Sequence, residues 1–172
     1  MSFPDDLDDV DVFTTGAVGE PGARTFFLQA RGASTAVTVK CEKQQVEALA
    51  TYLGQLLTDL PAPTDTPSEA TLELEDDDEL DASFVLGSIG VAWDEPADRV
   101  VLALEELVPT DAEGNPDPVA DEHKVILQVR LTRGQALAFS RHGLAIVAAG
   151  RPACRYCGLP RDRDGHICPR MN

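Results

Sequence analysis

The sequence predicts an α+β fold in which six mostly antiparallel strands form one pseudo-symmetric sheet and two helices cover one of its faces. Two observations carry this prediction. Six segments alternate apolar and polar residues and are rich in β-branched or aromatic side chains, whereas two longer segments carry apolar residues at helical spacing. These segments follow one another as strand, strand, strand, helix, and then in the same order again, which indicates two βββα repeats.

The first half of the chain, about 12–60, supplies three strands and a long helix. Turn residues near Glu20 and the sequence RGAS separate the strands. The strands are expected at about 12–18, 24–31 and 35–41. The helix should span about 42–60, because one of its faces carries an apolar stripe over four turns. That stripe consists of Val46, Leu49, Leu53, Leu56, Leu57 and Leu60.

The second half, about 83–150, repeats this pattern with a longer acidic loop from Val108. Thr132 and Gln135 have the spacing of a capping box and should open the second helix. Gly143 weakens the helix prediction, since a glycine in a helix interior costs about 1 kcal/mol, so 144–149 could instead be extended. The strands are expected at about 83–93, 98–107 and 123–131.

Internal similarity supports a duplication. The stretch TAVTVKCEKQQVEAL resembles KVILQVRLTRGQALAF, and a gapless alignment places Val37 over Leu127 and Gln45 over Gln135. Chance remains the alternative, since any two short hairpin-plus-helix units look alike. The expected organisation is a duplicated domain over 1–150, whose halves are joined by an acidic Pro/Thr-rich linker at 61–82, and a separate unit at 151–172.

Charge is distributed unevenly along the 172 residues, whose net charge is −16. Residues 1–123 hold 28 of the 30 acidic residues and only five of the 14 basic ones. We expect the acidic runs at 5–11 and 73–81 to be solvated and mobile, and the sequence assigns them no role. No apolar run of about 18 residues predicts a membrane span, and the acidic N-terminus does not resemble a signal peptide, so a cytoplasmic protein is expected.

The C-terminal stretch RPACRYCGLPRDRDGHICPRMN concentrates three of the four cysteines and one of the three histidines. In a cytoplasmic protein such a cluster indicates a metal site rather than disulfides. Cys154 and Cys157 form a CxxC turn, and a turn-rich loop could bring back His166 and Cys168, which lie on one face of an extended segment. Four nitrogen and sulfur ligands complete a zinc shell, which predicts a structural Cys3His zinc ribbon over 151–172.

Other chemistry-bearing residues form no catalytic set in the sequence. We expect Cys41 to be a buried apolar residue, His123 to be exposed, and His142 to face solvent or an acidic neighbour. Arginines near the C-terminus could grip phosphates, or they could neutralise the acidic part of the molecule or contact a protein partner. The strong negative charge, which repels nucleic acid, favours the second reading. The candidate interaction residues are Arg141, Arg151, Arg155, Arg161 and Arg163.

Several stretches, including RTFFLQARG, LGSIGVAWDEPADRVVLALEEL and the ending CxxCGxP…GHxCPRxN, are similar to an uncharacterised actinobacterial family, the domain-of-unknown-function family 3090. The similarity covers roughly 12–172. It implies a cytosolic protein without an established activity. It also implies a gene neighbourhood with a histidine-phosphatase-like and a kinase-like protein, and hence a shared pathway or complex. No catalytic residues carry over from this family.

Three hypotheses of function follow. The favoured one is a non-catalytic adaptor or regulatory module that uses a structural zinc ribbon for contacts with another protein. The second is an enzyme or small-molecule-binding protein that works in a cleft between the two repeats, where a pseudo-twofold axis often leaves a groove. The third is a nucleic-acid binder that acts through the arginine-rich C-terminal part.

Overall fold

The computed structural model describes residues 7, 9–75, 80–150, 154–158 and 168–170, and over these residues it is an α+β protein. Its six strands form one sheet in chain order: β1 (Val12–Val18), β2 (Thr25–Arg31), β3 (Ala36–Cys41), β4 (Phe84–Asp94), β5 (Arg99–Glu106) and β6 (Ile126–Leu131). The helices are α1 (Lys43–Thr58), the short α2 (Pro118–Glu122) and α3 (Arg133–Ala148), with a 3-10 turn, η2, at Glu69–Leu72. The mostly antiparallel sheet predicted from alternation is confirmed.

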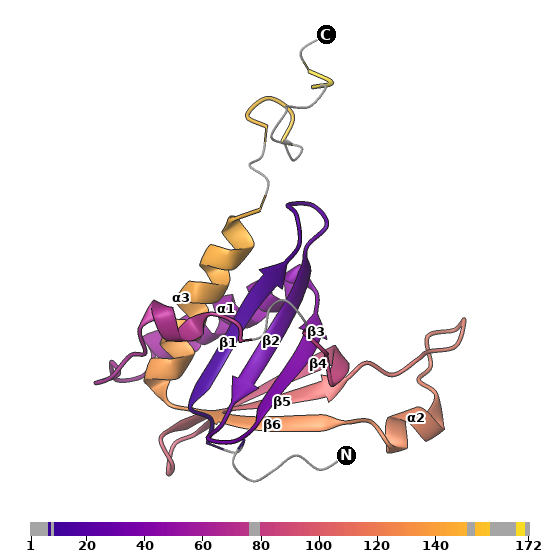
Figure 1. Ribbon diagram of the computed structural model, residues 1–172. Helices are drawn as coiled ribbons and strands as arrows, with labels where there is room; N and C mark the ends of the chain where they lie inside the picture. Colours follow the sequence, from indigo (N-terminus) through magenta and orange to yellow (C-terminus); the bar gives the residue numbers. More distant parts are fainter. Residues whose placement is uncertain (1–6, 8, 76–79, 151–153, 159–167, 171–172) are drawn as a thin grey trace.

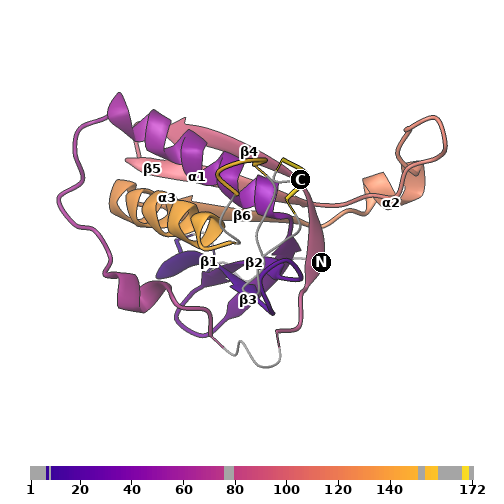
Figure 2. The same cartoon turned by 90° about the horizontal axis from the view of Figure 1, so that it is seen from above.

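The sheet bends sharply at its middle. The parallel pairing of β3 with β4 covers only two residue pairs, Val39 with Phe84 and Lys40 with Val85, whereas neighbouring strands elsewhere pair in antiparallel fashion along most of their length. Strands β1–β3 therefore run steeply across β4–β6 (Figure 1). Helices α1 and α3 lie side by side on the inner side of this bend (Figure 2).

The parallel central pair corrects the expected symmetry. A twofold axis perpendicular to the middle of the sheet would make β3 and β4 antiparallel, but they are parallel. Strands β1, β3, β4 and β6 all point the same way, so the second half of the sheet follows the first by a shift along the sheet. The halves are therefore not related by the twofold axis that was expected to leave a groove between them.

Apolar side chains from the inner face of the sheet and from both helices form one core. Phe13 of β1 stacks on Phe139 of α3 with ring centroids 4.8 Å apart. Alternate residues of β5 and β6 are fully buried beneath the helices, as period-two patterning requires. These residues are Val100, Leu102, Leu104, Leu127, Val129 and Leu131.

Helix α3 continues through the segment for which the sequence left an extended conformation open, so that alternative was wrong. Its start is the predicted capping box, in which Thr132 Oγ1 accepts from the Gln135 amide at 3.1 Å. Gly143 is tolerated because α1 passes close to it: a Cβ there would lie 3.1 Å from the Cβ of Ala50. Ser140 Oγ also donates to the Ala50 carbonyl at 2.6 Å, so close contact between the helices replaces the lost helix propensity.

Part of the linker between the halves packs against the outer face of β1–β3. Leu72 is only 2% exposed, and Thr14 Oγ1 donates to its carbonyl. The Gln29 side chain bonds the backbone of Glu75 in both directions, at 3.0 and 3.1 Å, and Arg31 pairs with the Glu75 carboxylate at 2.8 Å. The expectation of a mobile linker was therefore wrong for residues 69–75, although most of them are solvent-exposed as expected. Residues 76–79 lie outside the described chain.

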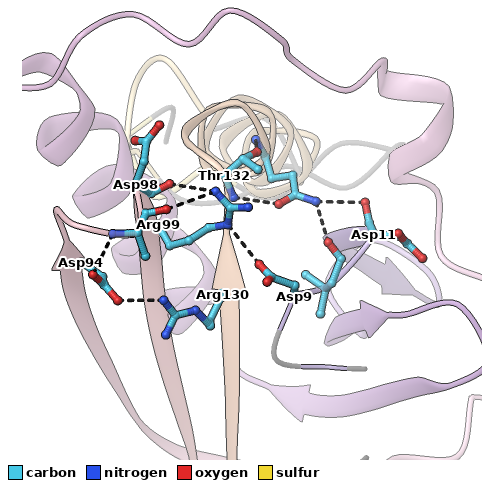
Figure 3. A network of polar contacts seen from close by, with 10 residues as sticks. Asp9, Asp11, Asp94, Asp98, Arg99, Arg130 and Thr132 are labelled. Atoms are coloured by element: carbon cyan, nitrogen blue, oxygen red, sulfur yellow. Dashed lines mark hydrogen bonds and ion pairs between the residues drawn. The ribbon is translucent and has the colours of Figure 1, made fainter. Parts of the chain in front are cut away.

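Charged side chains also fix the segment that precedes β1 (Figure 3). Asp9 pairs with Arg99 at 3.0 Å and forms a bridge to β6, and the Gln135 side chain donates to the carbonyl oxygens of Val10 and Asp11. Leu7 is 1% exposed beside them. The acidic N-terminal run is thus bound to the body at Asp9, which corrects the expectation of mobility there, although the Asp9 side chain is 69% exposed. Asp5, Asp6 and Asp8 lie outside the described residues. None of the helices in the described parts of the chain has the length and apolarity needed to cross a bilayer.

Candidate metal centre

A tight turn after α3 places two of the three C-terminal cysteines together. The Gly158 amide donates to the Cys154 carbonyl at 2.8 Å and closes the turn. Gly158 has a φ of 75°, which is in the left-handed region that glycine adopts without steric cost. The CxxC spacing therefore brings the thiols of Cys154 and Cys157 to one side, as the sequence predicted.

Cys168 completes a cluster of three sulfurs. The Sγ atoms of Cys154, Cys157 and Cys168 all lie within 4.8 Å of one another, and those of Cys154 and Cys168 are 3.9 Å apart. Zinc–sulfur bonds of about 2.3 Å in a tetrahedron place neighbouring sulfurs about 3.8 Å apart, so this spacing fits a tetrahedral thiophilic ion. Cys154 and Cys168 are buried and Cys157 is half-buried. These three cysteines could hold a metal ion.

Backbone amides favour the thiolate form that a metal requires. A hydrogen bond from the Cys157 backbone amide, followed by one from Tyr156, lowers the pKa of the Cys154 thiol to about 7. The Tyr156 nitrogen lies 3.5 Å from that sulfur. Cys41 behaves in the opposite way, since burial raises its pKa to about 12, and its prediction as a buried apolar residue is confirmed.

The structure describes only part of the predicted ligand and interaction set. His166, Arg151, Arg161 and Arg163 lie outside the described residues. Arg155 is exposed, and its guanidinium lies 4.7 Å from the ring centre of Tyr156.

Tyr156 is a feature that motif reading missed, although an aromatic residue inside the CxxC turn was a visible signal. Its side chain is 44% exposed at the tip of the turn, and Arg170 donates to its carbonyl at 3.2 Å. The turn thus presents an aromatic ring and an arginine together to solvent. Arg141 is also exposed, on α3, and makes no ion pair with the described residues.

Two other arginines of the basic C-terminal part neutralise acidic residues of the body. Arg130 pairs with Asp94 at 2.7 Å (Figure 3). Arg133 pairs with Asp98 at 2.8 Å. The hydrogen bonds from these guanidinium groups are the main reason that the pKa values of Asp94 and Asp98 are lowered. Both arginines are thus engaged within the molecule.

Neither remaining histidine joins a catalytic group in the described chain. His142 Nε2 lies 2.9 Å from the Thr15 carbonyl, so its partner is a backbone oxygen of β1 and not the solvent or acidic neighbour expected from the sequence. His123 follows α2 instead of beginning a strand, and its Nδ1 lies 2.8 Å from the Val119 carbonyl.

Comparison with known proteins agrees with the sequence similarity noted above. Neither the curated proteins nor the solved structures gave a match to this chain. A family model does match, over residues 5–168, and that span includes both the sheet and all three clustered cysteines. The chain therefore belongs to the family described as Protein of unknown function (DUF3090).

Proposed function

We propose that this protein is a non-catalytic adaptor whose C-terminal residues 151–172 form a zinc ribbon that docks onto another protein. The single observation that carries the proposal is the three-sulfur cluster of Cys154, Cys157 and Cys168. In this proposal His166 supplies the fourth ligand, because it stands two residues before Cys168, a spacing that would place both side chains on one face of an extended segment. A shell closed by four protein ligands has no open position for water, so the ion is structural.

The exposed side chains of the CxxC turn favour another protein as the partner. Tyr156 is the aromatic residue of the turn, and Arg155 stacks over it at 4.7 Å. Tyrosine and arginine are enriched among the residues that dominate binding energy in protein interfaces. A metal-fixed turn also holds these side chains in place before binding, which reduces the entropy lost on association.

Nucleic acid is the less favoured partner because of the charge of the whole molecule. The chain carries a net charge of −16, and Arg130 and Arg133 are engaged in ion pairs with Asp94 and Asp98. A polyanion would meet long-range repulsion from this surface. We also propose that the body, 1–150, arose by duplication of a βββα unit, since each half runs through three strands before its long helix.

Metal analysis tests the zinc site. The purified chain should carry about one zinc per molecule. The double variant Cys154→Ser with Cys157→Ser should lose it, and His166→Ala should weaken retention in a chelator competition. Cys41→Ala and His123→Ala are matched controls, because both residues lie outside the cluster. Full zinc content in the double-serine variant would refute the site.

Affinity capture tests the adaptor role. The wild-type chain should retain a partner that Tyr156→Ala and Arg155→Ala lose while their zinc content stays unchanged. Tyr52→Ala is the control, since Tyr52, on α1, is the only other tyrosine and is 50% exposed. Equal capture by the wild type and by Tyr156→Ala with its zinc retained would argue against docking through the turn.

A further inference from the structure

A second candidate site lies on the body and is independent of the cysteines. A cavity of about 630 Å³ opens where the ends of β3 and α3 meet the starts of β2 and α1. Arg24, Lys40 and Lys43 all line it, together with Phe26 and Gly150. This volume is within the range of roughly 300–1,000 Å³ that small-molecule sites occupy.

The cations of this cavity differ from the other basic residues of the first 123 residues in their ion pairing. Residues 1–123 contain only five: Arg24, Arg31, Lys40, Lys43 and Arg99. Arg31 is paired with Glu75 and Arg99 with Asp9. The other three line the same cavity, and none of them forms an ion pair with a described carboxylate. In an acidic protein, these three positive charges are therefore gathered in one place without an ion-pair partner among the described residues, although Glu42 also lines the cavity.

Two of these cations converge on one point. A Cβ added to Gly150 would lie 3.3 Å from Lys43 Nζ and 3.4 Å from an Nη atom of Arg24. The Arg24 guanidinium is held over the ring of Phe26, 5.7 Å from its centre, which limits the orientations it can adopt. Like charges that face the same point repel each other, and an anion placed between them removes that repulsion.

An internal role for these cations is the competing explanation. The point on which they converge also lies 3.6 Å from the Val147 carbonyl, so Arg24 and Lys43 could offset the negative C-terminal end of α3. Within the described chain, however, neither side chain donates a hydrogen bond to an α3 carbonyl, and Lys40 makes the positive charge larger than one helix end requires. Glu42, the acidic residue of the lining, is at the N-cap of α1 and pairs with none of the three cations.

We propose that this cavity binds a small metabolite that carries a phosphate group, which Arg24 and Lys43 hold while Lys40 adds positive charge at the rim. Arginine presents its donors in a planar fork that matches phosphate oxygens, and lysine adds a compact charge. Three cations suit the double charge of a phosphate better than the single charge of a carboxylate. The remaining volume, beside Phe26, accommodates an organic group.

Isothermal titration of the full chain at physiological salt tests the proposal, with inorganic phosphate, inorganic pyrophosphate and AMP as probes. Salt at this level screens loose attraction to exposed charges. Pyrophosphate should bind, and AMP should bind more tightly than phosphate if the cavity also receives the organic part. AMP that binds no more tightly than phosphate would overturn the metabolite assignment.

Variants locate the binding. Lys43→Gln and Arg24→Gln should each weaken pyrophosphate binding at least tenfold, whereas Arg99→Gln, which removes the same charge from an ion pair elsewhere, should leave it unchanged. Gly150→Ala keeps every charge but places a methyl group at the point that Lys43 and Arg24 face, so it should weaken pyrophosphate binding to a similar extent. Gly90→Ala is its control, because the added Cβ would meet Ala103 at an ordinary contact distance of 3.5 Å.

Two results would overturn the site. One is pyrophosphate binding that is equal in the wild type, Lys43→Gln and Gly150→Ala. The other is no binding by the wild type together with a lower urea midpoint for Lys43→Gln, which would show that the cations serve only α3. The variant Cys154→Ser with Cys157→Ser should bind pyrophosphate as the wild type does, so the outcome is separable from that of the zinc experiments.

Discussion

Replacing Leu72 by alanine tests whether the acidic linker is part of the folded body. The Leu72 side chain is 2% exposed, on the outer face of β1–β3. The change removes three carbon atoms, worth about 2.4 kcal/mol at about 0.8 kcal/mol per buried methylene. Leucine-to-alanine changes in rigid cores cost about 2–5 kcal/mol once the cavity is included. A linker collapses into the gap more easily than a core helix does, so we expect a loss of about 2–3 kcal/mol, which lies at the low end of that range.

Urea unfolding measures this loss, with the fluorescence of Trp93, the single tryptophan, as the probe. For a chain of this size the melting temperature should also fall by roughly 5–10 °C. Leu107→Ala is the matched control because Leu107 is 58% exposed, and its change should cost less than about 0.5 kcal/mol.

Cleavage by a glutamate-specific protease gives a local measure of the same contact. Glu69, Glu73 and Glu75 lie in the docked segment, and Leu72→Ala should make these sites cleave faster under native conditions. Unfolding and cleavage that match those of Leu107→Ala would show that residues 69–75 do not pack on the sheet.

Two further changes test the helix interface and the ion pairs. Gly143→Val adds a Cβ only 3.1 Å from the Cβ of Ala50 and should lower the free energy of unfolding by about 2–3 kcal/mol. The control Ala145→Val, at an exposed position of the same helix, should cost under about 1 kcal/mol. Equal urea midpoints for the two variants would contradict close packing of the helices. The Asp98 pKa is lowered chiefly by its hydrogen bond with Arg133, so its contribution to stability is complete above its ordinary value of about 4 and disappears as the pH falls through the lower folded value. The difference in urea midpoint between the wild type and Asp98→Asn should therefore be present at pH 7 and vanish near pH 2, while Glu47→Gln shows no such difference; a difference that persists at pH 2 would refute the linkage.

Local signals predicted the strands and helices well because they depend on neighbouring residues. The stripe from Val46 to Leu60 predicted 42–60, and α1 spans Lys43–Thr58. The Thr132 and Gln135 pair predicted the start of α3, and both capping bonds are formed. Alternation identified all six strands for the same reason, since each inward side chain marks its own face of the sheet.

Contacts between distant segments were beyond such reasoning. The acidic composition of the linker predicts solvation, but Leu74 lies against Gly16, whose missing side chain leaves room for it. That fit depends on residues from two separate segments, and neither is informative alone. The order of the strands across the bend, with β3 parallel to β4, likewise follows from the path of α1 and the linker over the sheet rather than from any local pattern.

The two sites differ in the same way. Cysteine spacing over fifteen residues was enough to predict the cluster of Cys154, Cys157 and Cys168, because the cluster forms within one short stretch of the chain. The cationic cavity joins Arg24, Lys43 and Gly150 from three segments, and no spacing in the sequence connects them. The only sequence signal for this cavity was the small number of basic residues in 1–123. That signal becomes informative only when the structure shows that Arg31 and Arg99 are already engaged in ion pairs.

Residues 1–123 are acidic and residues 124–172 are basic, but ion pairs between the two parts prevent them from forming one acidic and one basic face of the molecule. Arg130 and Arg133, from the basic part, are bound to Asp94 and Asp98 of the acidic part. Because these cations are engaged internally, the described basic groups left for external ligands are few and localised. Arg155 lies beside Tyr156 on the CxxC turn, while two cations of the cavity face a point beside Gly150. Gly150 lies four residues before Cys154 in the sequence, so a ligand in the cavity would contact the body at a residue close along the chain to the cysteine cluster.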